Sequence, residues 1–311
     1  MIQFFRQLKF ILKSLGYYFP FIRKCVELIV SNIERLEKKI LFFNKNIIEF
    51  PISKKSKIFL EKDTFISHLM LKDFEYEERF LVAQLLNKEG HFFDIGANIG
   101  LYSIIASETI KNYTIYAFEP TSFSRKKLAQ NIELNQIQNV EIIPNAVSSE
   151  DFKTQQLYIN QSGFDVFNSL LKPISGNYLT EKVETITLDT FIHQLNIDCQ
   201  QIQFIKMDVE GLELEVLQGA SNLLLKHPKI LYMIEFNEDF RKSNKCKNVF
   251  QLLNQYKYKC YFYNHAQKKL INIETIKENI SGNFFCIHIS QTATIKQKLL
   301  PQRIVIIDVN E

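Results

Sequence analysis

The stretch Phe92-Phe-Asp-Ile-Gly-Ala-Asn-Ile-Gly-Leu-Tyr-Ser103 decides the fold of this 311-residue chain. The apolar residues before Asp94 are typical of a buried strand. Gly96 and Gly100 permit a sharp turn and a close approach of the backbone to a ligand. Residues 99–110 then predict a helix. A strand, a glycine turn and a helix in this order indicate the first half of a nucleotide-binding α/β domain.

An acidic residue stands where such a domain holds a ribose. Glu119 follows Gly100 by nineteen residues, at the end of the strand predicted at 114–118. A carboxylate in that place accepts hydrogen bonds from both ribose hydroxyls. Asn98 occupies the position at which the dinucleotide fingerprint has a glycine that lets the backbone approach a pyrophosphate. The asparagine favours a nucleoside cofactor without a pyrophosphate, and S-adenosylmethionine (SAM) is the candidate.

A second motif reads Lys206-Met-Asp-Val-Glu-Gly211. This motif and the loop at 94–100, in this order and spacing, resemble the FkbM family of SAM-dependent methyltransferases. The resemblance extends over residues 74–289. Further matches to the family pattern are Phe118-Glu-Pro120, Asn145-Ala-Val147 and Ile186-Thr-Leu-Asp189. The resemblance implies the Rossmann-like fold of class I methyltransferases, an α/β, doubly wound, mostly parallel sheet of seven strands. The residue pattern before position 50 adds an N-terminal helical extension to this fold.

Strands and helices alternate through most of the chain, and this alternation also predicts a parallel, doubly wound sheet. The expected strands are 91–94, 114–118, 140–143, 203–207 and 230–235. The expected helices are 99–110, 122–136, 211–226 and 246–256, with Asp189 as the N-cap of a further short helix. Two late apolar segments, 258–263 and 284–289, suggest an antiparallel hairpin at the edge of the sheet.

Composition is consistent with one large α/β domain and an appendage. A hydrophobic content of 46% supports a sizeable core, and a net charge of +4 does not by itself imply nucleic-acid binding. Five scattered cysteines argue against a metal site or a disulfide framework and predict a reducing, cytoplasmic compartment. The expected regions are an N-terminal helical extension at 1–50, a connector with a leading helix at 51–90, the methyltransferase domain at 91–295 and a C-terminal tail at 296–311.

The first 45 residues predict two helices broken near Gly16–Pro20. Residues 1–50 carry nine basic and four acidic side chains. Three interpretations stay open: a hairpin packed on the catalytic domain or on a second copy of the chain, a peripheral membrane anchor, and nucleic-acid contact. The apolar stripe of the second helix has heptad-like spacing and comprises Ile22, Val26, Ile29, Ile33, Leu36, Ile40 and Phe43.

The cofactor is expected at the carboxyl ends of the first three strands. Asp94 would accept a hydrogen bond from the ammonium group of SAM, directly or through water. Asn145 borders the adenine in the pattern that the resemblance implies. As alternatives, Asp94 satisfies backbone N–H groups and Asn145 forms a turn. The full set of expected cofactor-binding residues is Asp94, Gly96, Asn98, Gly100, Glu119 and Asn145.

Three acids are expected on the acceptor side of the same cleft. Asp208 and Glu210 end one strand, and Glu235 ends the apolar strand 230–235. They can act as a general base, hydrogen-bond the substrate or bind a divalent cation, and the need for a metal stays open. Glu210 could instead cap the next helix. Lys206 either pairs with an acid near the cofactor or is structural.

The sequence therefore predicts methyl transfer from SAM. The acceptor, a hydroxyl oxygen of a sugar, glycan or other small metabolite, comes from family association. No nucleic-acid partner is expected. An NAD-dependent oxidoreductase or epimerase is the alternative enzyme class, which Asn98 disfavours, and a non-catalytic SAM-binding protein is the third class. The acceptor pocket is expected in loops such as 160–182.

Overall fold

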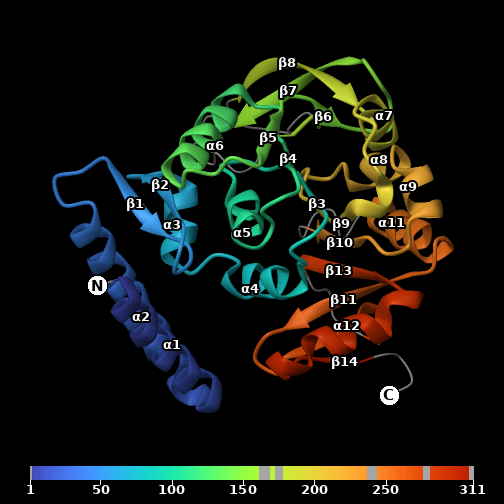
Figure 1. The fold of residues 1–311 in the computed structure, drawn as a ribbon. Helices are drawn as coiled ribbons and strands as arrows, with labels where there is room; N and C mark the ends of the chain where they lie inside the picture. Colours follow the sequence, from blue (N-terminus) through green and yellow to red (C-terminus); the bar gives the residue numbers. More distant parts are fainter. Residues whose placement is uncertain (1, 161–168, 172–177, 237–243, 276–280, 308–311) are drawn as a thin grey trace.

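The fold centres on one large twisted sheet (Figure 1). The computed structural model describes residues 2–160, 169–171, 178–236, 244–275 and 281–307. Nine strands form the large sheet within these residues. In spatial order they are β14 (Val305–Ile307), β12 (Lys269–Asn272), β11 (Tyr258–Asn264), β13 (Gly282–His288), β10 (Leu231–Phe236), β9 (Ile202–Met207), β3 (His91–Ile95), β4 (Ile115–Phe118) and β5 (Val140–Ile143).

The predicted doubly wound, mostly parallel sheet is confirmed. Strands β10, β9, β3, β4 and β5 pair in parallel, and β13 is antiparallel to both β10 and β11. The sheet has two strands more than the expected seven, because β12 and β14 continue it beyond β11. The antiparallel pair at 258–263 and 284–289 therefore exists but does not form the edge. The strand at this edge, β14, is only three residues long, too short to show a periodic pattern in the sequence.

Both faces of the sheet are buried, which explains why its strands read as continuous apolar runs. Phe92 packs in one core cluster and its neighbour Phe93 in the other, because successive side chains point to opposite faces. One cluster involves α4 (Tyr76–Leu85), α5 (Leu101–Thr109) and α12 (Thr292–Leu299). The other involves α7 (Leu188–Gln194), α8 (Glu213–Gln218), α9 (Ser221–Lys226) and α11 (Asn244–Gln255).

A second, three-stranded sheet lies beside the carboxyl end of β5 and was not predicted (Figure 1). It contains β6 (Ala146–Val147), β8 (Tyr178–Ile186) and β7 (Thr154–Asn160), and α6 (Ser122–Leu134) packs nearby. The N-cap expected at Asp189 is wrong. Thr187 caps α7 by accepting from the backbone N–H of Thr190, and Asp189 accepts from Asn222 N and Leu223 N in α9.

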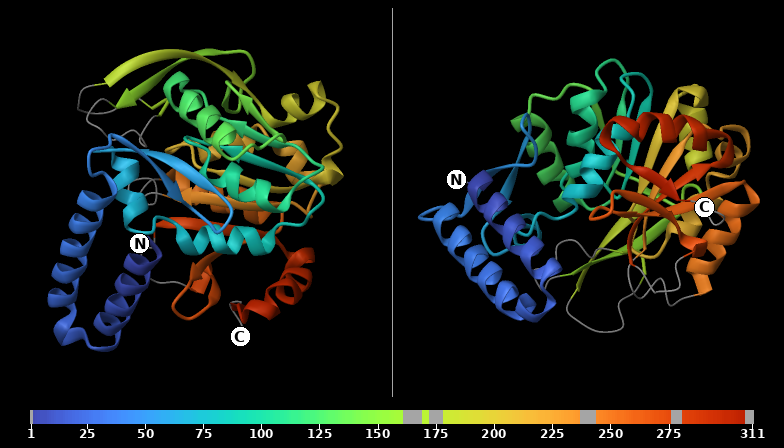
Figure 2. Two further views of the ribbon diagram at one scale, coloured as in Figure 1. Left: turned by 60° about the vertical axis from the view of Figure 1, so that its left-hand side comes forward. Right: turned by 90° about the horizontal axis from the view of Figure 1, so that it is seen from below.

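The amino-terminal part forms the two predicted helices. They are α1 (Ile2–Tyr18) and α2 (Arg23–Leu41), joined by a 3₁₀ turn, η1 (Pro20–Ile22), and followed by β1 (Ile47–Pro51), β2 (Lys57–Glu61) and α3 (Phe65–Leu71). Figure 2 shows α1 and α2 lying side by side as a helical hairpin. No helix in the described part of the chain is long and apolar enough to cross a membrane. Within the predicted stripe Val26 is buried, whereas Ile29, Leu36, Ile40 and Phe43 are exposed.

The carboxyl-terminal segment packs on the rest of the domain. The segment at 296–311, expected as a tail, carries the end of α12 and the edge strand β14. The ammonium of Lys298 in α12 donates to the carbonyl oxygen of Leu85 in α4 at 2.7 Å and so joins the carboxyl-terminal segment to the domain. The remaining helices in the described part of the chain are short 3₁₀ turns, η2 (Cys199–Gln201), η3 (Ile273–Thr275), η4 (Ile289–Gln291) and η5 (Leu300–Gln302).

Candidate functional site

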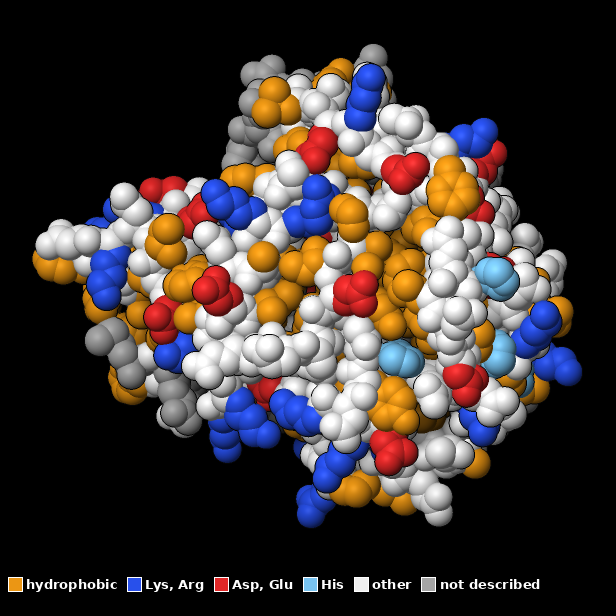
Figure 3. Space-filling model, turned by 45° about the horizontal axis from the view of Figure 1, so that its top comes forward, with side chains coloured by type: hydrophobic (Ala, Val, Ile, Leu, Met, Phe, Trp, Pro, Cys, Tyr) orange, Lys and Arg blue, Asp and Glu red, His pale blue; other side chains and the backbone are white. Residues whose placement is uncertain are grey.

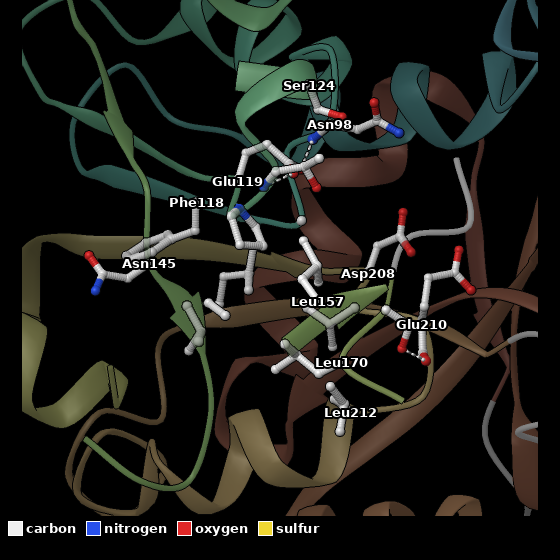
Figure 4. A pocket seen from close by; sticks show the side chains of 18 residues that line it. Asn98, Phe118, Glu119, Ser124, Asn145, Leu157, Leu170, Asp208, Glu210 and Leu212 are labelled. Carbon is white, nitrogen blue, oxygen red and sulfur yellow. Dashed lines mark hydrogen bonds between the residues drawn. The ribbon is translucent and has the colours of Figure 1, made fainter. Parts of the chain in front are cut away.

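A hollow opens at the carboxyl ends of β3, β4, β5 and β9, where parallel sheets hold their ligands. Its volume is about 630 Å³, counting the part open to solvent. Figure 4 shows Asn98 and Glu119 together on one side and Asp208 and Glu210 on another. Six of the residues selected from the sequence line this hollow: Gly96, Asn98, Glu119, Asn145, Asp208 and Glu210.

The turn after β3 depends on a glycine for a reason that the sequence did not reveal. Gly96 has φ +75°, and a Cβ atom there would lie 1.8 Å from the carbonyl oxygen of Asp208. Only glycine lets the loop after β3 pass so close to the loop after β9. The backbone N–H groups of Gly96 and Ala97 both donate to the carbonyl oxygen of Phe118. The turn therefore joins the ends of three strands around the hollow.

Glu119 is buried and held by backbone donors. One carboxylate oxygen accepts from Asn98 N and the other from Thr121 N, both at 2.8 Å. Burial raises the pKa of Glu119, although these hydrogen bonds oppose the effect. Each carboxylate oxygen has two lone pairs, so each can accept one further hydrogen bond. The side chain can therefore still bind two vicinal hydroxyl groups, as a ribose presents them.

Asp94 and Gly100 lie behind the hollow and do not line it. Asp94 is fully buried and accepts from both the backbone N–H and the hydroxyl of Ser103, at 2.9 and 2.6 Å. It thus satisfies backbone groups in the first turn of α5, which is the alternative role considered from the sequence. Gly100 precedes α5 with φ +88°, and a Cβ atom there would lie 2.3 Å from Leu128 Cδ1. Both residues support the turn from behind.

Asn145 lies at the apolar end of the hollow, next to β6. Its side-chain nitrogen donates to the carbonyl oxygen of Glu184 at 3.4 Å, and the residue is half-buried. Figure 4 shows Phe118 beside it, with Leu157 further along the wall. This wall suits a flat, largely apolar ring with a polar rim.

Lys206 is a buried cation between the carboxylates of Asp94 and Asp208. Its ammonium lies 3.1 Å from an oxygen of Asp208, 3.9 Å from Asp94 and 3.1 Å from the carbonyl oxygen of Gly96. Burial alone would lower the pKa of Lys206, but the surrounding carboxylates, Asp208 first, raise it. The lysine therefore stays charged and compensates the acids around it.

Asp208 and Glu235 form a coupled carboxyl pair. Burial would raise the pKa of Asp208, but Lys206 and a hydrogen bond from Glu235 lower it. The negative charge of Asp208, together with burial, holds the pKa of Glu235 well above its usual range. These opposite shifts favour the ionised form of Asp208 and the protonated form of Glu235. Asp208 is also partly open to the hollow, because 30% of its side chain is exposed.

Two residues that the sequence did not reveal complete this network. Glu75 immediately precedes α4 in a left-handed conformation with φ 49°, and its carboxylate accepts from the side-chain amide of Asn283 in β13. Burial raises the pKa of Glu75 to about 7, and the charges of Lys206 and Asp208 act on it. No signal in the sequence pointed to Glu75. Its distinguishing feature is a positive φ at a residue other than glycine, which is visible only in the structure.

Glu210 lines the rim of the hollow, and Glu213 supports the loop beneath it. Glu210 has φ 52°, and its carbonyl oxygen accepts from the hydroxyl of Ser169 at 3.1 Å. Glu213, at the start of α8, accepts from Val209 N and Gly211 N. The N-cap position of α8 is occupied by Leu212, so Glu210 does not have the helix-capping role considered from the sequence, and Glu213 holds the loop before the helix. Of the loop at 160–182, Ser169 and Leu170 line the hollow, whereas 161–168 and 172–177 lie outside the described residues.

A divalent cation has no evident binding site among the described residues. They contain no group of three or more His, Cys, Asp or Glu side chains arranged to hold a metal ion. The positive charge beside Asp208 comes from Lys206. On the face shown in Figure 3, Lys and Arg side chains are interspersed with Asp and Glu, so no large basic patch forms there.

The sheet order and the acids at the carboxyl ends of β4 and β9 define a class of protein: the chain has the Rossmann-like fold of class I SAM-dependent methyltransferases. The family can also be named. The model described as methyltransferase FkbM domain matches residues 94–260, more than half of the chain. The chain belongs to this family, and the resemblance read from the sequence is confirmed.

Two relatives carry the word methyltransferase in their names. "Methyltransferase 1" of Beauveria bassiana (strain ARSEF 2860) is 24% identical over 145 residues, which are 42% of this chain and 57% of that protein. "Methyltransferase sdnD" of Sordaria araneosa is 28% identical over 200 residues, which are 55% of this chain and 71% of that protein. The chain thus spans little more than half the length of the first.

Solved structures similar to this chain include a "rRNA Methylase from Streptococcus thermophilus". It is 12% identical with a TM-score of 0.39, and the match covers 68% of this chain and 92% of that one. "M. jannaschii TYW2 in complex with AdoMet" is 14% identical with a TM-score of 0.39, and the match covers 78% and 83%.

Proposed function

We propose that the chain transfers the methyl group of SAM to a hydroxyl oxygen of a sugar, glycan or other small metabolite. The observation that carries this proposal is the carboxylate of Asp208, which borders the hollow with the Lys206 ammonium 3.1 Å from it. A hydroxyl nucleophile must lose its proton during methyl transfer, so it needs such a base. The family supports methyl transfer itself.

The residues of the hollow fit SAM. Glu119 has free lone pairs for the two ribose hydroxyls, and the wall near Asn145 and Phe118 suits the adenine. SAM supplies an electrophilic methyl group on a sulfonium. Gly96 keeps the loops after β3 and β9 in contact, so the cofactor side and Asp208 face one space. We assign cofactor binding to Gly96, Asn98, Glu119 and Asn145, and a supporting role to Asp94 and Gly100.

The protein's own contribution to the reaction is to orient the acceptor and move one proton. Asp208 accepts the proton of the acceptor hydroxyl. Lys206 keeps Asp208 ionised until that moment, and Glu235 orients its carboxylate by a hydrogen bond. We assign hydrogen bonding of the acceptor to Glu210, because it lines the rim of the hollow.

Other functions are less well supported by the site. Asn98 lies against Glu119 where a pyrophosphate would need a glycine, which argues against an NAD-dependent oxidoreductase. A non-catalytic SAM-binding protein would not need an ionised acid beside the hollow. A nucleic-acid acceptor would call for a basic surface on the catalytic domain. The whole chain has a net charge of +4 and residues 1–50 have a net charge of +5, so residues 51–311 have a net charge of −1.

The test is calorimetry followed by methyl transfer. The purified chain should bind SAM and not NAD. Incubation with methyl-labelled SAM and separate pools of oligosaccharides, hydroxylated small metabolites and RNA should label one of the first two pools with a base-stable ether. Binding of NAD without SAM would overturn the enzyme class. Label found only in RNA would overturn the acceptor class and leave methyl transfer intact.

A further inference from the structure

The helical hairpin, residues 2–41, contacts the other described residues through one side. Arg6 of α1 forms an ion pair with Asp73 at 2.9 Å, and Lys38 of α2 forms one with Asp63 at 2.8 Å. Between the helices the buried pair Lys9–Glu37 lies at 2.9 Å, and Lys9 also donates to the carbonyl oxygen of Leu71 in α3. These contacts define the side of the hairpin that faces the body of the molecule.

The opposite side exposes two apolar stripes. Along a helix, two positions correspond to a rotation of about 200°, so a residue and its second neighbour point in nearly opposite directions. Phe4 is two positions from Arg6, and Leu36 and Ile40 are each two positions from Lys38. The exposed stripe residues are Phe4, Ile11 and Leu15 in α1 and Ile29, Leu36 and Ile40 in α2. Spacings of seven and four keep each set on one side of its helix.

The turn between the helices adds two exposed aromatic side chains. Phe19 precedes the 3₁₀ turn and Phe21 lies within it, and Phe21 is 84% exposed. In Figure 2 this end of the hairpin points away from the central sheet. Isolated exposed hydrophobic residues are ordinary, but a row of this length on one side of two helices marks a contact surface.

Charge indicates what covers this surface. Helix α1 contains no acidic residue. The exposed acid Glu27 is paired with Arg23 at 3.0 Å. A second copy would bring the same positive charge to the contact, whereas anionic lipid headgroups bring the opposite charge. The exposed basic side chains of the hairpin are Lys13, Arg23, Lys24, Arg35 and Lys39.

We propose that the hairpin docks on a bilayer surface that contains anionic lipids, with α1 and α2 lying in the plane of the interface. The apolar stripes enter the boundary between headgroups and acyl chains, and Lys and Arg side chains reach back to the headgroups. The catalytic domain, bound to the other side of the hairpin through Asp63, Leu71 and Asp73, is thereby held beside the membrane.

Co-sedimentation of the full chain with vesicles tests this proposal without any measurement of methyl transfer. Vesicles of phosphatidylcholine alone are compared with vesicles that also contain phosphatidylglycerol, at physiological salt. The wild type should sediment with the anionic vesicles. The pair Leu36→Asp and Ile40→Asp should lower the partition coefficient at least about tenfold. The pair Arg35→Gln and Lys39→Gln should lower it several-fold.

A matched control is Leu225→Asp on α9, because Leu225 is 67% exposed, as Leu36 is 51% exposed, but lies outside the hairpin. It should leave vesicle binding unchanged, and thermal unfolding should show all variants folded. Absence of wild-type binding to anionic vesicles would overturn the proposal. A dimer would also overturn it, if sedimentation showed that the dimer depends on protein concentration and that Leu36→Asp and Ile40→Asp dissociate it. The apolar stripes would then contact a second copy of the chain.

Discussion

The two sides of the hollow are built by different means. On the cofactor side, Glu119 is held by backbone N–H groups of Asn98 and Thr121, which lie within about two dozen positions of it along the chain. On the acceptor side, Asp208 is held by charged side chains, and Glu75 and Asn283 reach the same cluster from segments more than 200 positions apart. The first side is a local backbone arrangement, and the second is an assembly of distant charges.

The difference has an energetic consequence. Backbone donors stay in place when a side chain is replaced, so a substitution on the cofactor side removes only the bonds of that side chain. In the charge cluster, each removal changes the protonation of the remaining acids, because their pKa values depend on one another. The effects of two substitutions on the first side should therefore add. On the second side, the effect of one substitution should depend on whether the other is present.

The largest effect is expected at Asp208. Asp208→Asn removes the ionised acceptor and should lower kcat by about 10²–10⁴-fold, the usual contribution of a general base. Glu235→Gln should keep most of the activity, because a glutamine amide can still donate to Asp208 as the protonated acid does. Steady-state kinetics with the acceptor that the labelling experiment identifies measures both.

SAM affinity is the control for that pair and should change little in either variant. Equal loss of kcat in Asp208→Asn and Glu235→Gln would show that Glu235 also acts in its ionised form. Full activity of Asp208→Asn would remove Asp208 from the chemistry.

The junction between the two sides should be nearly as sensitive. Gly96→Ala places a Cβ atom against the Asp208 carbonyl oxygen and should cost more than the ~1–3 kcal/mol of a strained positive φ alone. Gly282→Ala is the matched control, because Gly282 also has a positive φ but no atom within 4 Å of the added Cβ. Urea unfolding gives both free energies, and similar values would show that the Gly96 contact relaxes easily.

A smaller effect is expected on the cofactor side. Glu119→Ala removes the acceptor for the ribose hydroxyls and should weaken SAM binding about 10–100-fold, since hydrogen bonds to charged groups contribute ~1.5–3 kcal/mol. Calorimetry measures the affinity, with Glu141→Ala, an exposed acid on β5, as the control. Unchanged affinity in Glu119→Ala would place the ribose elsewhere.

The smallest effect concerns stability against pH. Burial raises the pKa of Glu213 from 4.5 to about 7. Between these pH values the folded state holds the proton that the unfolded state has lost, so stability should fall as the pH rises, by at most about 1.4 kcal/mol per pH unit. Glu213→Gln keeps acceptors for Val209 N and Gly211 N and should flatten this slope in urea unfolding at pH 5, 6 and 7. An unaltered slope would assign the titration to another group, such as Glu75.

Local patterns in the sequence determined much of the molecule. The strands at 140–143, 203–207 and 230–235 were predicted within one residue of their observed bounds, because apolar runs and turns depend on neighbouring residues. Gly96 and Glu119 were found for the same reason, since the turn and the acid occupy set positions at the ends of consecutive strands. The broken pair of helices in the hairpin likewise follows from periodicity and from Pro20.

Only the tertiary structure decided how distant groups meet. The sheet order brings β13 and the start of α4 beside β9, and this neighbourhood makes Glu75 and Asn283 part of the acceptor side. The packing of α7 against α9 likewise brings Asp189 to the backbone of α9. The charge state of a buried acid depends on every charge around it, and those neighbours are set by packing across the sheet, which no local pattern in the chain encodes.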